Sequence, residues 1–458
     1  MKFRGGYTFK NFEGASEPVL REITAPGRIV IPLSFGDGLI LTPSVSAGET
    51  VRAGDPLLAS SGGNVSAPVS GTVSEINPDT IVIESDGFSG NSAFSPVDGH
   101  SREPWHLERA EIFDLFRSTG CSFLAGGRFD TLERCGSVKD IIVNAVHNAP
   151  LNRTWTPEVF GEPDVFPNGL KVLRALFGDA VITIAANKRN RGYFESPEIR
   201  ESANTAVVSD RYPQEHPEIL SRTIVDKPLI SPLGKPDESV AVVDFTDVIQ
   251  ISETMTQGRP LIDRIVMIAG AGVSNPGWYR VRIGTQFEDI LSGLLKSDAD
   301  TSWRIIRGDI FTGRGLEAPE GSVMFGDSEI SVIKEHASRD LFSFMMPGFA
   351  ADSYSRTTVA EYLPLFPKKL ETNVHGGVRP CVQCNYCDEV CPADIYPFLI
   401  WKHVEADLVE ESFRLRPYDC VECGLCDYVC PSKIDIMSSV KISKEKYCEI
   451  KGADDVSD

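Results

Sequence analysis

Eight cysteines in the C-terminal part of this 458-residue chain limit its possible folds more than any other feature. They form two copies of the pattern C-x2-C-x2-C-x3-C-P. The first copy holds Cys381, Cys384, Cys387 and Cys391, and the second holds Cys420, Cys423, Cys426 and Cys430. Three thiolates at this spacing wrap around one cubane cluster, while the fourth points to a neighbouring cluster. The pattern therefore predicts two [4Fe–4S] clusters.

The fourth cysteine of each copy is expected to cross over to the other cluster. One cluster would be held by Cys381, Cys384, Cys387 and Cys430, and the other by Cys420, Cys423, Cys426 and Cys391. Structural zinc is the alternative, but zinc sites usually take two C-x2-C pairs. Three cysteines stand apart and are expected to be small buried residues or free thiols: Cys121, Cys135 and Cys448.

The charge balance excludes several classes of partner. Asp and Glu number 65 against 45 Lys and Arg, which gives a net charge of −20. Such a chain is not expected to bind nucleic acid or anionic lipid by general attraction. No apolar run approaches the ~18 residues of a membrane helix, and the N-terminus MKFRGGYTFK lacks the apolar stretch of a secretory signal. We therefore expect a cytoplasmic location, where disulfides are rare.

The N-terminal region, residues 1–104, has the pattern of a small β domain. Short β segments separated by glycines run from 28 to 84 and resemble the lipoyl/biotinyl barrel-sandwich fold. Such carriers need a lysine at a hairpin tip, and no lysine lies between Lys10 and Lys139. Covalent lipoyl or biotin is therefore excluded in this segment, and a docking or scaffolding role is expected.

Residues 105–258 predict a Rossmann-like α/β domain, because apolar strands alternate with helical patterns. Helices are expected at 111–120 and 167–179, and strands at 139–146, 180–187 and 240–251. The loops at 144–152 and 187–191 follow strands, where ligands bind in such sheets. The second loop is basic, so a phosphate or an acidic partner is an alternative to a solvated loop. His147 is expected to be structural rather than catalytic.

The rest of the chain is divided by composition and motif. Residues 259–330 suggest a β-grasp module of the SLBB (soluble-ligand-binding β-grasp) type, with the glycines at 270–272 lacking the G-x-G-x-x-G frame of a dinucleotide site. Residues 331–375 are expected to be a linker and 376–450 an α-helical dicluster ferredoxin domain. The acidic tail, 451–458, is expected to be disordered.

This order of domains resembles the RnfC/NqrA superfamily, whose members belong to the Rnf ferredoxin:NAD oxidoreductase and to the sodium-translocating NADH:quinone reductase, Nqr. Both are related to the flavoprotein subunit of respiratory complex I. The resemblance covers residues 1–445. RYPQ at 211–214 and the second cysteine motif look like Rnf, whereas VNAVHNAPLN at 143–152, IRGDIFTGR at 306–314 and LFSFMMPGF at 341–349 look like Nqr.

The resemblance also points to a flavin loop. The RnfC protein seats FMN in a G-x-GG-x-GFPT loop, and the corresponding stretch here is TGCSFLAGGRFDT at 119–131. Gly126 and Gly127 are kept, but Arg128 follows them and the FPT turn is missing. Glycine is needed there because the backbone must come close to the flavin and its phosphate. FMN and NADH are therefore doubtful cofactors, and we expect neither to bind tightly.

The resemblance implies an iron–sulfur electron-transfer subunit of a membrane-bound, ion-translocating NADH:quinone or ferredoxin:NAD oxidoreductase. Its partners would be the other subunits, with quinone, ferredoxin or NAD(H) reached through the complex. It would lie peripherally on the cytoplasmic face of the inner membrane. The alternatives are an FMN-containing NADH dehydrogenase subunit, for which a cobalamin-reducing microcompartment flavoprotein is a minor variant, and a scaffold with structural clusters.

Overall fold

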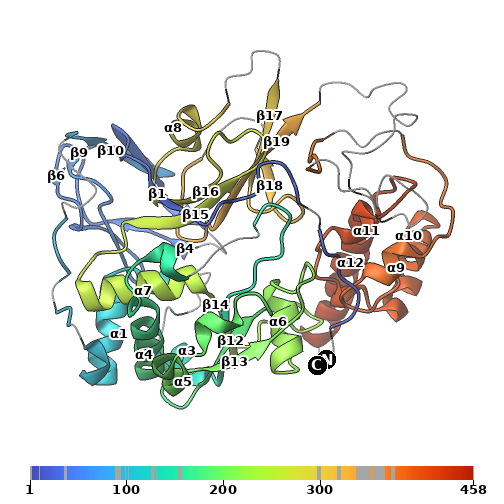
Figure 1. Cartoon of the computed structure of the whole chain (residues 1–458), viewed down its shortest axis with the longest axis horizontal. Helices are drawn as coiled ribbons and strands as arrows, with labels where there is room; N and C mark the ends of the chain where they lie inside the picture. Colours follow the sequence, from blue (N-terminus) through green and yellow to red (C-terminus); the bar gives the residue numbers. More distant parts are fainter. Residues whose placement is uncertain are drawn as a thin grey trace.

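The computed structural model shows three units built around β-sheets and a fourth, helical unit at the C-terminal end (Figure 1). The structure describes residues 3–9, 11–35, 39–87, 94–97, 99–101, 103–124, 129, 132–152, 157–296, 301–316, 321–336, 352, 354, 367–372 and 377–456. Within these ranges no helix has the length and apolar character needed to cross a membrane.

The first unit is the barrel sandwich. One of its sheets has the order β2-β10-β9-β6, a second has the order β5-β7-β8, and β3 pairs with β4. Apolar residues alternate along its strands, so Ile29, Ile31, Ile81 and Ile83 fill the interior. The strands are β2 (Arg28–Pro32), β3 (Ser34–Phe35), β4 (Leu39–Ile40), β5 (Thr42–Pro43), β6 (Thr50–Val51), β7 (Pro56–Ala59), β8 (Asn64–Ser66), β9 (Gly71–Ile76) and β10 (Thr80–Ser85).

The second unit is a parallel sheet of order β13-β12-β11-β14 with helices packed beside it. Its strands are β11 (Asp140–Asn144), β12 (Val181–Ala186), β13 (Asn204–Val207) and β14 (Val240–Asp244). Its α-helices are α1 (Arg109–Ser118), α3 (Leu132–Ser137), α4 (Val165–Phe177), α5 (Pro197–Ser202), α6 (Pro217–Ile224) and α7 (Phe245–Gln257). Short 3₁₀ turns are η1 (Pro104–His106), η2 (Cys121–Phe123), η3 (Pro157–Phe160) and η4 (Arg191–Phe194).

One expected strand of this unit is too long. Strand β14 ends at Asp244, and the remainder of the 240–251 segment is the start of helix α7. The side chain of Asp244 accepts a hydrogen bond from the backbone N–H of Thr246 and so caps the helix. The apolar run therefore holds a strand and a buried helix joined at a capping residue, which periodicity alone did not separate.

The third unit is the β-grasp module, a six-stranded sheet of order β1-β16-β15-β19-β17-β18. Its elements are β1 (Leu20–Glu22), β15 (Asp263–Ala269), β16 (Gly277–Arg282), α8 (Phe287–Ser292), β17 (Ser302–Arg307), β18 (Arg314–Leu316) and β19 (Glu329–Glu335). Two expected boundaries are corrected by this sheet. Strand β19 pairs with both β15 and β17, so the module extends past residue 330. Strand β1 pairs with β16, although it lies in the segment assigned to the barrel sandwich.

The fourth unit is helical and contains two similar halves. Its elements are α9 (Tyr386–Val390), α10 (Pro397–Glu405), η7 (Glu410–Leu415), η8 (Pro417–Asp419), α11 (Leu425–Tyr428) and α12 (Ile436–Val456). The halves repeat with an offset of 39 residues, as from Cys381 to Cys420 and from Pro397 to Ile436. Helix α12 continues through Val456, which corrects the expectation of disorder from residue 451 onward.

The N-terminal segment ties the helical unit to the parallel-sheet unit. The N–H of Gly6 donates to the carbonyl of Val390 at 2.8 Å, and Arg211 donates to the carbonyl of Gly5 at 2.6 Å. Figure 1 shows the dark blue N-terminal segment passing beside the red helical unit, in agreement with these hydrogen bonds. The first residues of the chain therefore help to fix the position of the cysteine-bearing domain.

Candidate metal centres

The structure brings the eight motif cysteines together in two adjacent cavities. The first thiol cavity is lined by the side chains of Cys381, Cys384, Cys387 and Cys430, with Val382, Phe398 and Trp401 among its walls. The second thiol cavity is lined by Cys391, Cys420, Cys423 and Cys426, and also by Cys387, which lines both cavities. Apart from this shared cysteine, each cavity combines cysteines of one motif with the last cysteine of the other.

Two residues with left-handed backbone conformations shape each cysteine loop. In the first cysteine loop, residues 381–387, these are Gln383 (φ 54°) and Asn385 (φ 61°), and in the second cysteine loop, residues 420–426, they are Glu422 (φ 56°) and Gly424 (φ 74°). This turn directs the N–H of Gln383 to the Sγ of Cys381, at 3.4 Å. The N–H of Glu422 reaches the Sγ of Cys420 at the same distance. Backbone donors to sulfur stabilise the thiolate and tune the potential of a bound cluster.

A half-buried aspartate links each cysteine loop to the helix that follows. Asp427 Oδ1 lies 3.7 Å from the Sγ of Cys426 and accepts hydrogen bonds from the first two backbone N–H groups of helix α12, at 2.8 and 2.9 Å. Asp388 has the equivalent position beside Cys387 and accepts from the N–H of Phe398 in α10. The helix start and the loop therefore hold one another in place.

The donor set fits iron–sulfur clusters. Burial raises the pKa of the Cys387 and Cys420 thiols to about 12, so without metal these side chains are neutral. Iron binding has to displace these protons, and cluster assembly is therefore coupled to proton release. Among the described residues, no three His, Cys, Asp or Glu side chains form a group that could hold a single metal ion.

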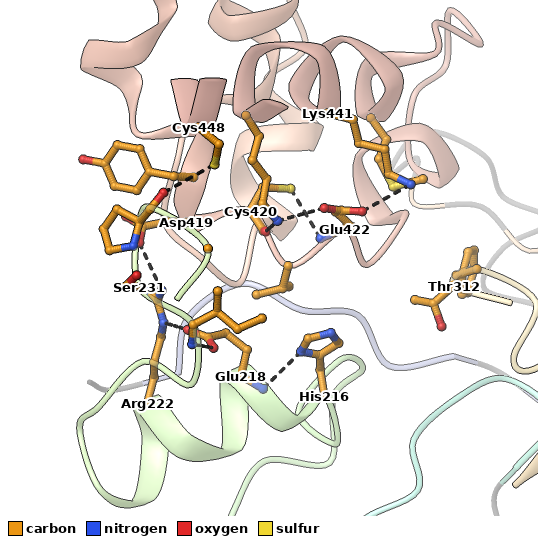
Figure 2. Close-up of a pocket in the computed structure, with 18 of the residues that line it drawn as sticks. His216, Glu218, Arg222, Ser231, Thr312, Asp419, Cys420, Glu422, Lys441 and Cys448 are labelled. Atoms are coloured by element: carbon orange, nitrogen blue, oxygen red, sulfur yellow. Dashed lines mark hydrogen bonds and ion pairs between the residues drawn. The ribbon is translucent and has the colours of Figure 1, made fainter. Parts of the chain in front are cut away.

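A larger pocket of about 510 Å³ lies against the second cysteine loop (Figure 2). The side chain of Arg222 in α6 bridges Glu218 at 2.6 Å and Asp419 at 3.0 Å. On the opposite wall Lys444 donates to Glu422 at 2.8 Å and to the carbonyl of Cys420 at 3.1 Å. The charged side chains that line the pocket, from the parallel-sheet unit and the helical unit, therefore form ion pairs with one another.

Aromatic side chains join the body of the protein to the second cysteine loop. The hydroxyl of Tyr212 donates to the carbonyl of Cys423 at 2.9 Å. The ring of Phe311, from the β-grasp module, packs on Gly424, where an added Cβ would lie 3.2 Å from the Cβ of Phe311. The two rings lie 5.3 Å apart between centroids. Sequence reasoning noted RYPQ and IRGDIFTGR as motifs but gave no sign that Tyr212 and Phe311 meet at a cysteine loop.

At the carboxyl edge of the parallel sheet, polar groups of the chain form hydrogen bonds with one another. Asn144 donates to the carbonyl of Glu215 at 3.3 Å, and the N–H of Asn148 donates to the carboxylate of Glu215 at 3.2 Å. Asn190 in the basic loop donates to the carbonyl of Ala145 at 2.6 Å. Groups that could meet a ligand at this edge are thus bonded to one another.

His147 lies on the same edge, in an apolar setting. Its ring makes edge contacts with Phe245 and Trp278 at 5.2 and 5.9 Å between centroids. Burial lowers its pKa to about 3, so the imidazole is neutral at physiological pH. These contacts favour the structural interpretation of His147 over a catalytic one.

Of the remaining positions predicted from the sequence, the structure describes the three separate cysteines but not the expected flavin loop glycines. Cys121 and Cys135 are buried, as expected, and burial raises the pKa of the Cys121 thiol to about 11. Cys448 is half-buried, with its Sγ 3.6 Å from the carbonyl of Pro232. Gly126, Gly127 and Arg128 of the expected flavin loop, and the 341–349 motif, lie outside the described residues.

Three family models match the chain. A "4Fe-4S dicluster domain" matches residues 380–434, an "RnfC Barrel sandwich hybrid domain" matches residues 1–89, and an "NQRA C-terminal domain" matches residues 265–318. The first match covers both cysteine motifs. The other two cover the barrel sandwich and the greater part of the β-grasp sheet.

Curated relatives are the A subunits of Na⁺-translocating NADH-quinone reductases. The protein from Yersinia pestis is 30% identical over 259 residues, which is 56% of this chain and 54% of the relative. The chain thus matches about half the length of the Yersinia relatives. The Klebsiella pneumoniae protein is 25% identical over 79% of this chain and 80% of the relative, and the Marinomonas protein is 23% identical over 88% of each. Among solved structures, an NAD⁺-reducing [NiFe]-hydrogenase aligns with a TM-score of 0.42 and 12% identity over 77% of this chain and 65% of that chain.

The cysteine motifs and the dicluster match define an iron–sulfur protein with a 4Fe-4S dicluster domain. The chain also contains the barrel-sandwich and β-grasp domains. The relatives it resembles are subunits of NADH-quinone reductases. These matches are consistent with the superfamily that contains RnfC and NqrA, whose members the chain resembles.

Proposed function

We propose that this chain is the iron–sulfur electron-transfer subunit of a membrane-bound NADH:quinone (Nqr-like) or ferredoxin:NAD (Rnf-like) oxidoreductase. The observation that supports the proposal is a pair of adjacent cavities that together hold the eight motif cysteines and share Cys387. Cys381, Cys384, Cys387 and Cys430 would hold one [4Fe–4S] cluster, and Cys391, Cys420, Cys423 and Cys426 the other. Bound there, the clusters would supply one-electron transfer.

The protein's own contribution is to fix the thiols and exclude water. Trp401 and Phe398 form walls of the first thiol cavity, and Leu425 and Val440 form walls of the second. Backbone N–H groups aimed at Cys381 and Cys420 add fixed donors to the sulfurs. None of these roles needs a general acid or base.

Anaerobic reconstitution tests the proposal. We expect about eight iron atoms and eight acid-labile sulfides per chain, and EPR signals from two clusters after reduction with dithionite. Iron for fewer than two clusters would contradict it, and zinc without sulfide would support the structural-zinc alternative instead.

The isolated chain is not expected to oxidise NADH. Asn148 and Glu215 bond to one another at the sheet edge where a flavin could otherwise bind, and Arg128 follows the two glycines of the expected flavin loop. We therefore expect no flavin absorbance after heat release and no reduction of the clusters by NADH without a partner. Rapid NADH-dependent bleaching, or a yellow supernatant, would instead support the FMN-containing dehydrogenase.

Attachment to a membrane is expected to run through the partner subunits. Because its net charge is −20, the chain is not expected to be attracted electrostatically to anionic lipid. In membranes that contain the whole complex, we expect an alkaline or chaotropic wash to release the chain without detergent, by breaking contacts between subunits. Immunoblots of the wash and the pellet measure this, and retention in the pellet would contradict it.

A scaffolding role with structural clusters remains the second candidate. The firm contact between the second cysteine loop and the body, through Tyr212 and Phe311, is the observation that favours it. It predicts clusters that resist reduction by dithionite, together with loss of complex assembly when the cysteines are replaced. Electron transfer predicts reducible clusters, so a dithionite titration separates the two functions.

A further inference from the structure

The two cysteine loops are repeats of one another, yet they differ sharply in exposure. Val382 in the first loop is 66% exposed, whereas its counterpart Val421 in the second loop is 8% exposed. Asn385 is exposed, and its counterpart Gly424 is buried. Because the local backbone is the same in both halves, the difference comes from what covers each loop.

The body of the same chain covers the second cysteine loop. Phe311 packs on Gly424 and Tyr212 donates to the carbonyl of Cys423, whereas Lys444, which donates to the carbonyl of Cys420, belongs to helix α12 of the helical unit itself. The contacts of Phe311 and Tyr212 show how a protein surface fits this loop type, with an aromatic ring against the turn and a donor to one of its carbonyls. The second loop is therefore an internal example of a docked cysteine loop.

As far as the described residues show, the equivalent surface of the first cysteine loop is exposed at Val382 and partly apolar, while the ring of Tyr354 packs on Tyr386 at the end of the loop, at 5.0 Å between centroids. Val378 is 69% exposed, and Cys381 and Cys384 are half-buried. The chain before Cys381 is held in position, because the N–H of Arg379 donates to the carbonyl of Ser432 at 2.9 Å and Ser432 donates to the carbonyl of Pro380 at 2.9 Å. Exposed valines beside half-buried cluster ligands form a preorganised surface, of the kind that marks an interaction site.

Three cations stand near this surface, although the whole chain is strongly acidic. Arg379 is the one charged residue within 377–387, and Lys433 follows Cys430 by three residues. The acids directly after the loop have partners of their own, since Asp388 accepts from the N–H of Phe398 and Glu389 accepts from the hydroxyl of Tyr354 at 3.0 Å. Lys402 lies over the ring of Phe398, a wall of the first thiol cavity, at 4.9 Å. A partner that presents carboxylates around an apolar centre would match both the valines and the cations.

We propose that the first cysteine loop, with Val378, Val382, Arg379 and Lys402, is the docking surface for an acidic one-electron carrier protein. The proposal rests on the proposed function and names the partner class that meets the first cluster. In the step, the reduced carrier loses one electron and the oxidised first cluster gains it, with no bond made or broken and no proton moved. The electron would then pass inward to the second cluster, whose loop is covered by the body.

The test uses the cluster-loaded chain and, as the probe, a small acidic ferredoxin with two [4Fe–4S] clusters. Val382→Glu places a carboxylate at the centre of the surface, and Leu408→Glu, at a position 49% exposed after helix α10, is the matched control. We expect Val382→Glu to weaken ferredoxin binding by calorimetry, and to slow reduction by reduced ferredoxin in stopped flow, each at least about tenfold. Leu408→Glu should leave both within twofold.

A second variant tests the charge. Lys402→Glu should weaken ferredoxin binding several-fold at low salt, and the loss should shrink as salt screens the interaction. Equal effects of Val382→Glu and Leu408→Glu, or a concentration-dependent dimer of this chain that Val382→Glu dissociates, would overturn the proposal. Dithionite separates the two levels of inference. If it cannot reduce the clusters, the proposed function fails, whereas normal dithionite reduction with an unaffected ferredoxin response overturns the docking surface alone.

Discussion

Replacing Cys391 with serine is expected to remove the cluster held by Cys420, Cys423 and Cys426, and to spare the cluster of its own motif. The reason is the arrangement of the cavities, since Cys391 lines the second thiol cavity while Cys381 and Cys384 of its own motif line the first. Anaerobic reconstitution followed by EPR and iron analysis measures the result. About four iron atoms per chain should remain, with the signal of a single cluster.

Cys430→Ser is the matched reciprocal variant. Cys430 lies in the second motif but lines the first thiol cavity, so its loss should remove the first cluster instead. The two variants should therefore lose different EPR signals, and alanine at each position excludes ligation by the serine oxygen. If each variant lost the cluster of its own motif, the crossed assignment would be wrong.

Much of the cysteine site could be predicted because its information is local. The spacing within C-x2-C-x2-C-x3-C-P alone predicts which thiols would share a cluster, and this assignment stays a prediction, with Cys387 lining both cavities. The strands of the parallel sheet were also predictable, since β11 and β12 are apolar runs bounded by polar turns. Local pattern suffices where one short segment carries the whole signal.

The contacts between domains could not be predicted. Tyr212 and Cys423 lie far apart in the sequence, and their hydrogen bond depends on how the parallel-sheet unit meets the helical unit. The same applies to β1, which joins the β-grasp sheet through a parallel pairing with β16. A segment of three residues carries too little pattern to predict its partner strand. The difference in exposure between Val382 and Val421 is also invisible in the sequence, where the two motifs read almost alike.

The internal repeat offers a physical reason for the asymmetry of the domain. The two halves have the same loop geometry, but the body covers the second cysteine loop and leaves Val382 of the first exposed. Burial and the hydrogen bonds near the sulfurs set cluster potentials. The two clusters that we propose would therefore have different environments, set by the rest of the fold.

Glu215→Gln is expected to stabilise the protein, and to do so more strongly as the pH rises. The Oε2 atom of Glu215 is enclosed without a hydrogen-bond partner, and burial raises the pKa of this carboxyl to about 8, with Asp309 and Glu329 adding negative charge nearby. In the unfolded chain the group ionises near pH 4.5. Between these values folding must take up a proton, so the stability of the native chain falls as the pH rises toward 8.

Glutamine keeps an acceptor for the N–H of Asn148 and has no charge to lose. The variant should gain little near pH 5 and progressively more up to pH 8. Between pH 6 and pH 8 its advantage should grow by about 1–3 kcal/mol, at 1.36 kcal/mol per pKa unit as the upper limit. Denaturant unfolding followed by tryptophan fluorescence at pH 6, 7 and 8 measures this, with the exposed Glu201→Gln as control.

Some slope will remain in Glu215→Gln, because burial also raises the pKa of Glu329 to about 8, so this carboxyl takes up a proton on folding as well. The hydroxyl of Ser331 donates a hydrogen bond to the carboxylate of Glu329 at 3.0 Å. This bond stabilises the ionised form of Glu329 and so opposes the effect of burial on its pKa. A double variant with Glu329→Gln should flatten the pH dependence further. A stability difference that stays constant from pH 6 to 8, or that matches Glu201→Gln, would mean that Glu215 is ionised in the folded protein.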